Sequence, residues 1–241
     1  MSRHHFYILI LSLFLWTACG DEIVEEPPVE KEFELYDTVA YEACADVCAN
    51  SPNRGKSVGV FGGSISSLPA TQVATVFWRT RLGMKVTSYG KRGAGFVVPT
   101  KNISDQVAVA GRHDIFIFWC SSNDYSYNHP NTTVAMQNEA MRKCIQTIRN
   151  KYPESKIYIF TSLKGFCNKW WRSLSQFAYG QMDLAKEMGL KCCNLYDLDY
   201  NTDETVSIFY QEDKVHPNET GYYNFGWRML YFLATEKNVG D

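Results

Sequence analysis

Short apolar segments alternate with longer amphipathic ones from about residue 57 to the end of the chain. The most apolar of the short segments are SVGVFG (57–62), DIFIFWC (114–120) and KIYIFT (156–161). Runs of this length, rich in Val, Ile and Phe and lacking a polar face, are typical of strands buried on both sides. Two further extended segments, 84–89 and 191–195, complete the set of predicted strands.

Between the predicted strands, apolar residues recur at the spacing of an amphipathic helix. In the segment 131–152, four apolar side chains fall on one helical face, and Thr132 or Thr133 can cap the helix. The other predicted helices span 71–82, 174–188 and 219–235. Strands that alternate with helices of this length form βαβ units, which give a parallel sheet covered by helices on both faces. The pattern therefore predicts a single α/β domain, a three-layer α/β/α sandwich with about five strands and no internal repeat.

The beginning of the chain has the pattern of an export signal. Arg3 supplies a positive charge, and residues 6–16 form an apolar run of eleven residues that is broken once. Such a run reaches about 16 Å as a helix, roughly half of the hydrocarbon core of a bilayer, so it indicates a signal segment and not a spanning helix. The small residues before Cys19 resemble the lipobox of bacterial lipoproteins, in which Cys19 would be lipidated. Trp16 stands where that motif usually has leucine.

The segment behind Cys19 is acidic and lacks apolar periodicity, which predicts an extended tether. It resembles the acidic stretch of surface-exported lipoproteins in Bacteroidetes-type bacteria. We therefore expect a signal peptide at 1–18, a lipid-anchored cysteine and tether at 19–55, and the folded domain at 56–241. The expected location is the bacterial cell envelope, anchored in the outer membrane and either periplasmic or surface-exposed. An ordinary secretory signal is the alternative.

Composition and charge narrow the class of protein further. The 241 residues are 45% hydrophobic and 21% charged, with a formal net charge of −2. These values are typical of a globular protein and argue against a disordered chain or a polytopic membrane protein. Because the charge is nearly balanced and forms no basic run, there is no electrostatic reason to expect a nucleic-acid partner.

Eight cysteines raise the question of disulfides, since an exported chain enters a compartment that permits them. Seven remain once Cys19 is set aside, so at least one must be free. Cys120 and Cys144 lie in apolar segments and are predicted to be buried, while Cys44 and Cys48 are four apart in a stretch of helical character. No CxxC pair or Cys-His cluster occurs, so we expect no zinc site.

Candidate functional residues gather where open α/β sheets bind ligands, at the carboxyl ends of the strands. The sequence Gly62-Gly63-Ser64 follows the first predicted strand, GKRGAG (90–95) the second, and SSND (121–124) the third. The sequence DKVHPN (213–218) opens the last predicted helix. The predicted topology brings all four segments to one edge of the sheet.

These residue types suit nucleophilic catalysis. A serine becomes a useful nucleophile only when a base lies in hydrogen-bond reach and a third group orients that base. Asp213 and His216 are three apart, so one helical turn would put the carboxylate beside the imidazole. Backbone N–H groups of the glycine-rich turns and the Asn123 amide can donate to an oxyanion that forms next to Ser64.

The other histidines are weaker candidates for the base. His4 and His5 belong to the predicted signal. His113 precedes the third strand and is expected about 23 Å from that strand's active end. His129 follows Asn123 at the correct edge, but no carboxylate is spaced to orient it. His216 is therefore the predicted base.

In this order, the four segments resemble the conserved blocks of the SGNH hydrolase superfamily, also called GDSL-like lipases and esterases. The resemblance implies a flavodoxin-like sheet, with Ser64 as nucleophile, His216 as base and Asp213 as the acid that orients it. It also implies that the N–H groups of Ser64 and Gly93 and the side chain of Asn123 stabilise the oxyanion.

The resemblance spans roughly residues 57–235 and departs from the family at two positions. The usual GDS has Gly63 in place of aspartate, and the usual GxND begins with Ser121 in place of glycine. The missing aspartate is not one of the family's proton-transfer groups, so we expect altered support of the loop more than lost chemistry.

Each of these residues also has a purely structural interpretation. Ser64 can cap the first helix, and the glycines of 90–95 can be turn residues that need positive φ. Asn123 can form an Asx turn, and Asp213 can cap the last helix while His216 lies exposed in its first turn.

The resemblance implies a secreted serine hydrolase that cleaves an ester through an acyl-enzyme, without a metal or an organic cofactor. For a surface lipoprotein of this family the expected substrate is an acylated glycan, with acetyl as the model acyl group. Trp170 and Trp171 are candidates to stack on a sugar, with buried packing as the alternative. Two other functions stay open: an O-acyltransferase with the same triad, and a silent carbohydrate-binding protein in which Gly63 and Ser121 mark a decayed site.

Overall fold

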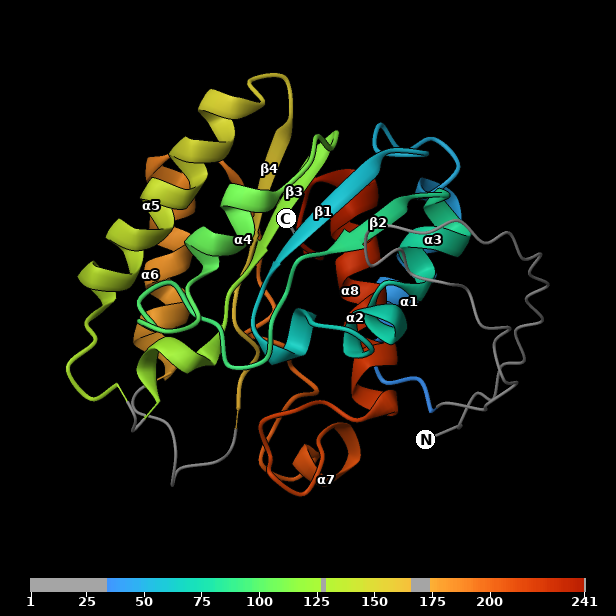
Figure 1. Ribbon diagram of the computed structural model, residues 1–241. Helices are drawn as coiled ribbons and strands as arrows, with labels where there is room; N and C mark the ends of the chain where they lie inside the picture. The colour runs from blue at the N-terminus through green and yellow to red at the C-terminus, as the bar shows by residue number, and fades with distance from the viewer. Residues whose placement is uncertain (1–33, 127–128, 166–173, 241) are drawn as a thin grey trace.

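The computed structural model describes residues 34–126, 129–165 and 174–240. Within them, five parallel strands form one sheet in the order β2-β1-β3-β4-β5 (Figure 1). The strands are β1 (Ser57–Gly62), β2 (Lys85–Ser88), β3 (Ile115–Trp119), β4 (Lys156–Phe160) and β5 (Lys191–Cys193). Each strand lies inside the segment predicted for it, and the order is the flavodoxin-like one. The predicted fold class is confirmed.

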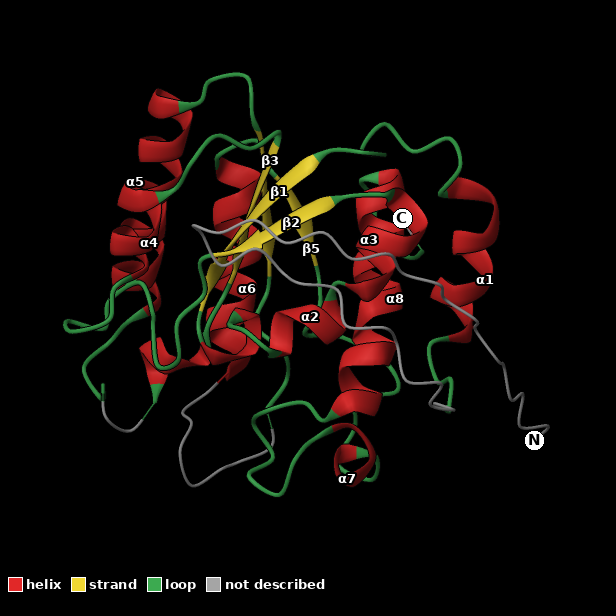
Figure 2. Cartoon of the chain, turned by 45° about the vertical axis from the view of Figure 1, so that its right-hand side comes forward, coloured by secondary structure: helices red, strands yellow, loops and turns green. Residues whose placement is uncertain are grey.

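Helices cover both faces of this sheet. Helices α4, α5 and α6 lie on one face, and α1, α2, α3 and α8 lie on the other (Figure 2). Their bounds are α1 (Thr38–Val47), α2 (Ala70–Ala74), α3 (Val76–Leu82), α4 (Ile103–Val109), α5 (Val134–Lys151), α6 (Leu174–Glu187), α7 (Val206–Phe209) and α8 (Glu219–Thr235), with the 3-10 turns η1 (Ser64–Ser66) and η2 (Ser122–Tyr125). None of the helices in the described ranges is long and apolar enough to cross a membrane.

The central strand β3 shows why the strand sequences lack a polar face. Ile115, Ile117 and Trp119 pack in the cluster that contains α8, whereas Phe116 and Phe118 pack in the cluster that contains α5. All five side chains are at most 1% exposed. Because both sides of β3 are covered by helices, every position along it is apolar.

The predicted helix 71–82 is two helices in the structure. Thr75, between α2 and α3, has φ −102° and ψ 8°, outside the helical region. Its hydroxyl donates to the carbonyl of Thr71 at 2.6 Å. A threonine that bonds back to the preceding turn tends to bend or interrupt a helix, and the apolar spacing alone does not reveal this.

The folded domain begins well before residue 56, where the predicted tether was expected to end. Residues 38–47 form α1, which packs along α8. Ala40, Cys44 and Cys48 are buried, and the Tyr41 ring contacts Trp227 edge to face at 4.8 Å. The four-residue spacing of Ala40, Cys44 and Cys48 gives an apolar stripe that the acidic residues upstream obscured.

A buried ion pair fixes α1 to α8. The Asp37 carboxylate accepts hydrogen bonds from Arg228 Nε at 2.9 Å and Nη2 at 3.2 Å. It also accepts from the N–H of Ala40 and so caps α1. The side chain of Asp37 is 1% exposed and that of Arg228 is 15% exposed. Removal of the carboxylate would therefore leave a largely buried guanidinium without its partner.

We expect Asp37→Ala to lower the free energy of unfolding by about 3 kcal/mol, from the unpaired guanidinium and the lost helix cap. Urea denaturation followed by circular dichroism measures the difference. Asp46→Ala is the matched control, because Asp46 lies exposed on the same helix. Its expected change is below about 0.5 kcal/mol. Equal losses in the two variants would contradict the role of the ion pair.

The described cysteines are free thiols: Cys44, Cys48, Cys120, Cys144, Cys192 and Cys193. Cys120 and Cys144 are 1% and 4% exposed, which confirms that they are buried. Burial raises the pKa of the Cys144 thiol to about 12. The Cys120 and Cys144 thiols are therefore protonated at neutral pH and pack as small apolar side chains. Cys167 lies outside the described residues.

Candidate active site

Ser64 stands at the carboxyl end of β1, at the start of η1. The end of this strand is held by Gln106 from α4, a side chain that is fully buried. Its Nε2 donates to the carbonyl of Gly62 at 2.9 Å, and its Oε1 accepts from the Gly62 N–H at 3.0 Å. Because both polar atoms of Gly62 are bound, the backbone that carries Ser64 is fixed.

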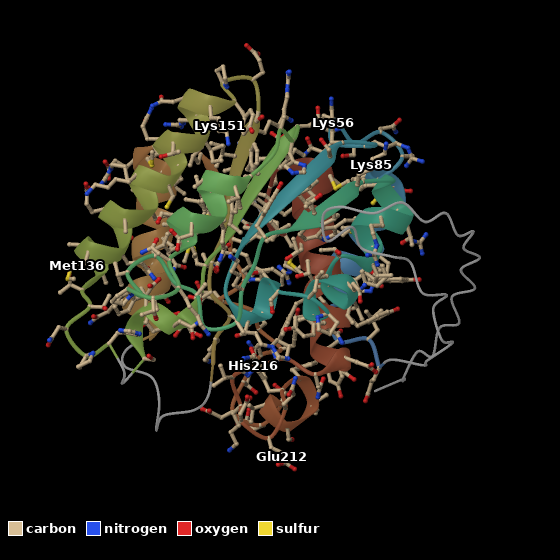
Figure 3. All side chains as sticks on the ribbon, in the orientation of Figure 1. Lys56, Lys85, Met136, Lys151, Glu212 and His216 are labelled. Carbon is tan, nitrogen blue, oxygen red and sulfur yellow. The ribbon has the colours of Figure 1, made fainter. Side chains whose placement is uncertain are left out.

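His216 lies beside Ser64, at the same end of the sheet (Figure 3). Its Nε2 is 2.8 Å from Ser64 Oγ, and its Nδ1 is 2.5 Å from Asp213 Oδ2. The structure thus brings the three predicted residues into one hydrogen-bonded series of hydroxyl, imidazole and carboxylate. The imidazole is in place to accept the hydroxyl proton, with the carboxylate behind it.

A tight turn, and not a helix, brings Asp213 and His216 together. Asp213 Oδ1 accepts the N–H groups of Val215 and His216, both at 2.9 Å, and Lys214 adopts a left-handed φ of 56°. The helix α8 begins only at Glu219, with Asn218 as its cap. The predicted proximity is therefore correct, but the predicted helical turn is wrong. The Asx-type hydrogen bonds of Asp213 replace it.

The same turn keeps Asp213 ionised. Burial alone would raise the pKa of its carboxyl group, but hydrogen bonds from the His216 imidazole and from the N–H groups of His216 and Val215 hold the pKa below its usual value. The carboxylate is consequently charged across the neutral and mildly acidic range, where it can stabilise an imidazolium.

The backbone N–H groups of Ser64 and Gly93 are candidates to bind an oxyanion. Gly93 has φ +77° in the turn closed by the bond from the Ala94 N–H to the Lys91 carbonyl, a position that favours glycine. Among the described residues, neither the Ser64 N–H nor the Gly93 N–H donates to a protein acceptor. Free donors of this kind are what a developing negative charge on a substrate oxygen requires.

Asn123 is also part of this arrangement, but its amide is already bound. Its Nδ2 donates to the carbonyl of Ala94 at 2.9 Å and to Ser121 Oγ at 2.7 Å. The Ala94 carbonyl links Asn123 to the loop that carries Gly93. An oxyanion would therefore have to compete with a protein oxygen for one of the two amide hydrogens.

The other described histidines do not contact Ser64. His113 Nε2 is 2.8 Å from the hydroxyl of Tyr89, and burial lowers the pKa of this imidazole. His129 lies just after η2, where its backbone N–H donates to the Ser126 carbonyl at 2.8 Å. Of the predicted site residues, Cys19, Trp170 and Trp171 lie outside the described residues.

The structure adds a residue that the sequence did not single out. Asp124, fully buried, accepts from the Val97 N–H at 2.8 Å and from Gln137 Nε2 at 2.9 Å. It joins the loop behind Gly93 to α5. Burial raises the pKa of Asp124 against the opposing effect of these hydrogen bonds. In the sequence, only its position next to Asn123 indicated a role for Asp124, because its partner Gln137 lies in a different element.

A family model matches most of the chain. The GDSL-like Lipase/Acylhydrolase family model matches residues 60–223, which include Ser64, Gly93, Asn123, Asp213 and His216. No curated protein sequence matches the chain.

Solved structures of low sequence identity share the fold. A lipase/acylhydrolase from Enterococcus faecalis superposes with a TM-score of 0.56 at 15% identity, covering 77% of this chain and 99% of its own. Est24, a carbohydrate acetylesterase from Sinorhizobium meliloti, gives 0.57 at 13% identity, covering 76% and 100%. An aryl esterase from M. smegmatis gives 0.55 at 13% identity, covering 73% and 96%.

Proposed function

Because the chain belongs to the GDSL-like lipase/acylhydrolase family and is a carboxylic ester hydrolase, we propose that it removes a short acyl group, such as acetyl, from a carbohydrate. The proposed catalytic residues are Ser64, His216 and Asp213. The observation that carries this assignment is the series of contacts at 2.8 Å and 2.5 Å that joins the Ser64 hydroxyl to the Asp213 carboxylate through His216.

The proposed reaction proceeds through an acyl-enzyme. His216 Nε2 takes the proton of Ser64 as Oγ attacks the ester carbonyl, and Asp213 stabilises the imidazolium. The N–H groups of Ser64 and Gly93, together with the Asn123 amide, bind the oxyanion. Collapse of the tetrahedral intermediate transfers the proton to the leaving alcohol. Water then attacks the acyl-enzyme with His216 as base and releases the acid.

The open surface of the site favours hydrolysis over acyl transfer. The side chains of His216 and Asp213 are 37% and 46% exposed, so water can reach the imidazole that would act as base in deacylation. An O-acyltransferase needs to exclude water at this step. The intact contact between Ser64 and His216 likewise supports catalysis over a silent carbohydrate-binding protein.

The substrate proposal rests on the glycan expectation from the sequence and on the shared fold with Est24, a carbohydrate acetylesterase. A panel of acetylated glycans and p-nitrophenyl esters of increasing acyl length tests it. We expect acetate release from at least one glycan and a decline in kcat/KM beyond short acyl chains. Activity on long-chain esters alone, with no acetate released from any glycan, would reject the substrate. Acyl transfer to an added sugar that outpaces hydrolysis would favour the transferase.

We also propose that the protein is exported and anchored in the bacterial envelope by lipid on Cys19. The support is the apolar run, the small residues before this cysteine and the acidic stretch behind it. In cells fed a radioactive fatty acid, we expect label on the wild type and none on Cys19→Ser. Equal labelling of both proteins would rule out this anchor.

A further inference from the structure

The two departures from the family pattern, Gly63 and Ser121, contact each other. A Cβ atom at position 63 would lie 2.4 Å from Ser121 Oγ and 2.9 Å from Asn123 Nδ2. Carbon atoms do not approach side-chain oxygen and nitrogen so closely, so the Ser121 hydroxyl occupies the space that a side chain at position 63 would need. Compared with the family pattern, position 63 has lost a side chain and position 121 has gained one. The two departures are therefore sterically linked.

The Ser121 hydroxyl holds Asn123 in two ways. Ser121 Oγ accepts the backbone N–H of Asn123 at 3.1 Å and its side-chain Nδ2 at 2.7 Å. The second hydrogen on Nδ2 is bound by the Ala94 carbonyl. Ser121 is 5% exposed, so solvent does not substitute for its hydroxyl. The plane of the Asn123 amide is thus fixed between one oxygen from its own turn and one from the Gly93 loop.

We propose that Ser121 is a positioning residue for ester hydrolysis, which acts through the Asn123 amide, and that Gly63 provides the room it needs. This proposal rests on the proposed function. When negative charge develops next to Ser64, the charged oxygen is a stronger acceptor than a neutral hydroxyl. It can then share the hydrogen that Nδ2 donates to Ser121 Oγ as a bifurcated hydrogen bond, while Ser121 keeps the amide plane in position. A preoriented donor of this kind costs no reorganisation in the transition state.

A double-mutant cycle tests whether Ser121 acts through Asn123. We expect Ser121→Ala to lower kcat on p-nitrophenyl acetate about tenfold with KM changed less than about twofold, since an oxyanion donor is disturbed but not removed. In the Asn123→Ala background the same substitution should change kcat less than about twofold. The rate of Ser64 labelling by a fluorophosphonate should follow kcat.

The matched control is Ser122→Ala, the next residue of the same turn. Ser122 is half-buried, and its hydroxyl makes no hydrogen bond to the rest of the described chain. We expect its kcat to stay within about twofold of the wild type. An equal loss of kcat from Ser121→Ala in both backgrounds, or a loss matched by Ser122→Ala, would overturn the positioning role.

A second pair of variants tests whether side chains at positions 63 and 121 compete for the same space. We expect Gly63→Ala to lower kcat and the melting temperature, because its Cβ meets Ser121 Oγ. We expect Gly63→Ala/Ser121→Gly to recover part of the melting temperature, since the contacts of the Cβ with Asn123 Nδ2 at 2.9 Å and the Ala94 carbonyl at 3.0 Å remain. Additive losses would overturn the steric link between the two positions.

If the wild type neither hydrolyses esters nor reacts with the fluorophosphonate, the proposed function fails and the positioning role fails with it. An active wild type with additive cycles overturns the positioning role alone.

Discussion

Ser64→Ala is expected to lower kcat/KM for p-nitrophenyl acetate by about 10⁴-fold or more, close to the limit of detection. The hydroxyl is the only described group that lies against His216 Nε2, at 2.8 Å, so its removal leaves the base without a nucleophile to activate. The residual rate would come from the oxyanion donors and from binding alone. Steady-state kinetics with purified protein measures the loss, and the fluorophosphonate adduct should disappear with it.

The matched control for Ser64→Ala is again Ser122→Ala, which removes a nearby hydroxyl from the same edge of the sheet. We expect it to keep its activity and its labelling. The folded state of Ser64→Ala should be unchanged by circular dichroism, because the Ser64 hydroxyl is partly exposed and supports no described element other than the site. A folded Ser64→Ala protein with wild-type turnover would exclude Ser64 as nucleophile and require another nucleophilic group near His216.

The strands were predictable because their environment, covered by helices on both faces, accepts only apolar side chains. A strand covered on both faces must be apolar at every position, and β3 displays this over its whole length. The order of the four polar segments also predicted that Ser64 and His216 would meet, since parallel strands bring their carboxyl ends to one edge. These predictions depend on periodicity and topology, which a sequence carries directly.

Other features depend on contacts between distant residues and could not be predicted in the same way. Gly63 and Ser121 look like two independent departures in sequence, yet their atoms compete for one space. Gln106, which holds the strand end at Gly62, comes from the short helix α4, whose apolar pattern is too brief to detect. The boundary of the tether was misplaced because acidic composition upstream outweighed the apolar stripe of α1.

His216→Ala is the second substitution for which we expect a loss of about 10⁴-fold in kcat/KM. Without the imidazole, the Ser64 proton has no base within reach, and a neutral hydroxyl attacks esters poorly.

Asp213→Asn should lower kcat/KM less, by about 10²-fold to 10³-fold, because the imidazole stays in place but loses the carboxylate that stabilises its charged form. The partial exposure of Asp213 supports the smaller figure, since water can partly replace the lost charge.

The other described histidines provide the control for His216→Ala. His113 is bound to Tyr89 at the opposite end of β3, and within the described residues Ser64 Oγ contacts His216 and not His129, so neither His113 nor His129 is placed to receive the Ser64 proton. His129→Ala should therefore keep kcat/KM within about threefold of the wild type, although His129 lies at the same edge of the sheet as Ser64. If His129→Ala instead loses activity as His216→Ala does, the base cannot be assigned to His216 alone. If His216→Ala retains turnover, the contact at 2.8 Å does not carry the proton, and Ser64 must be activated by another group.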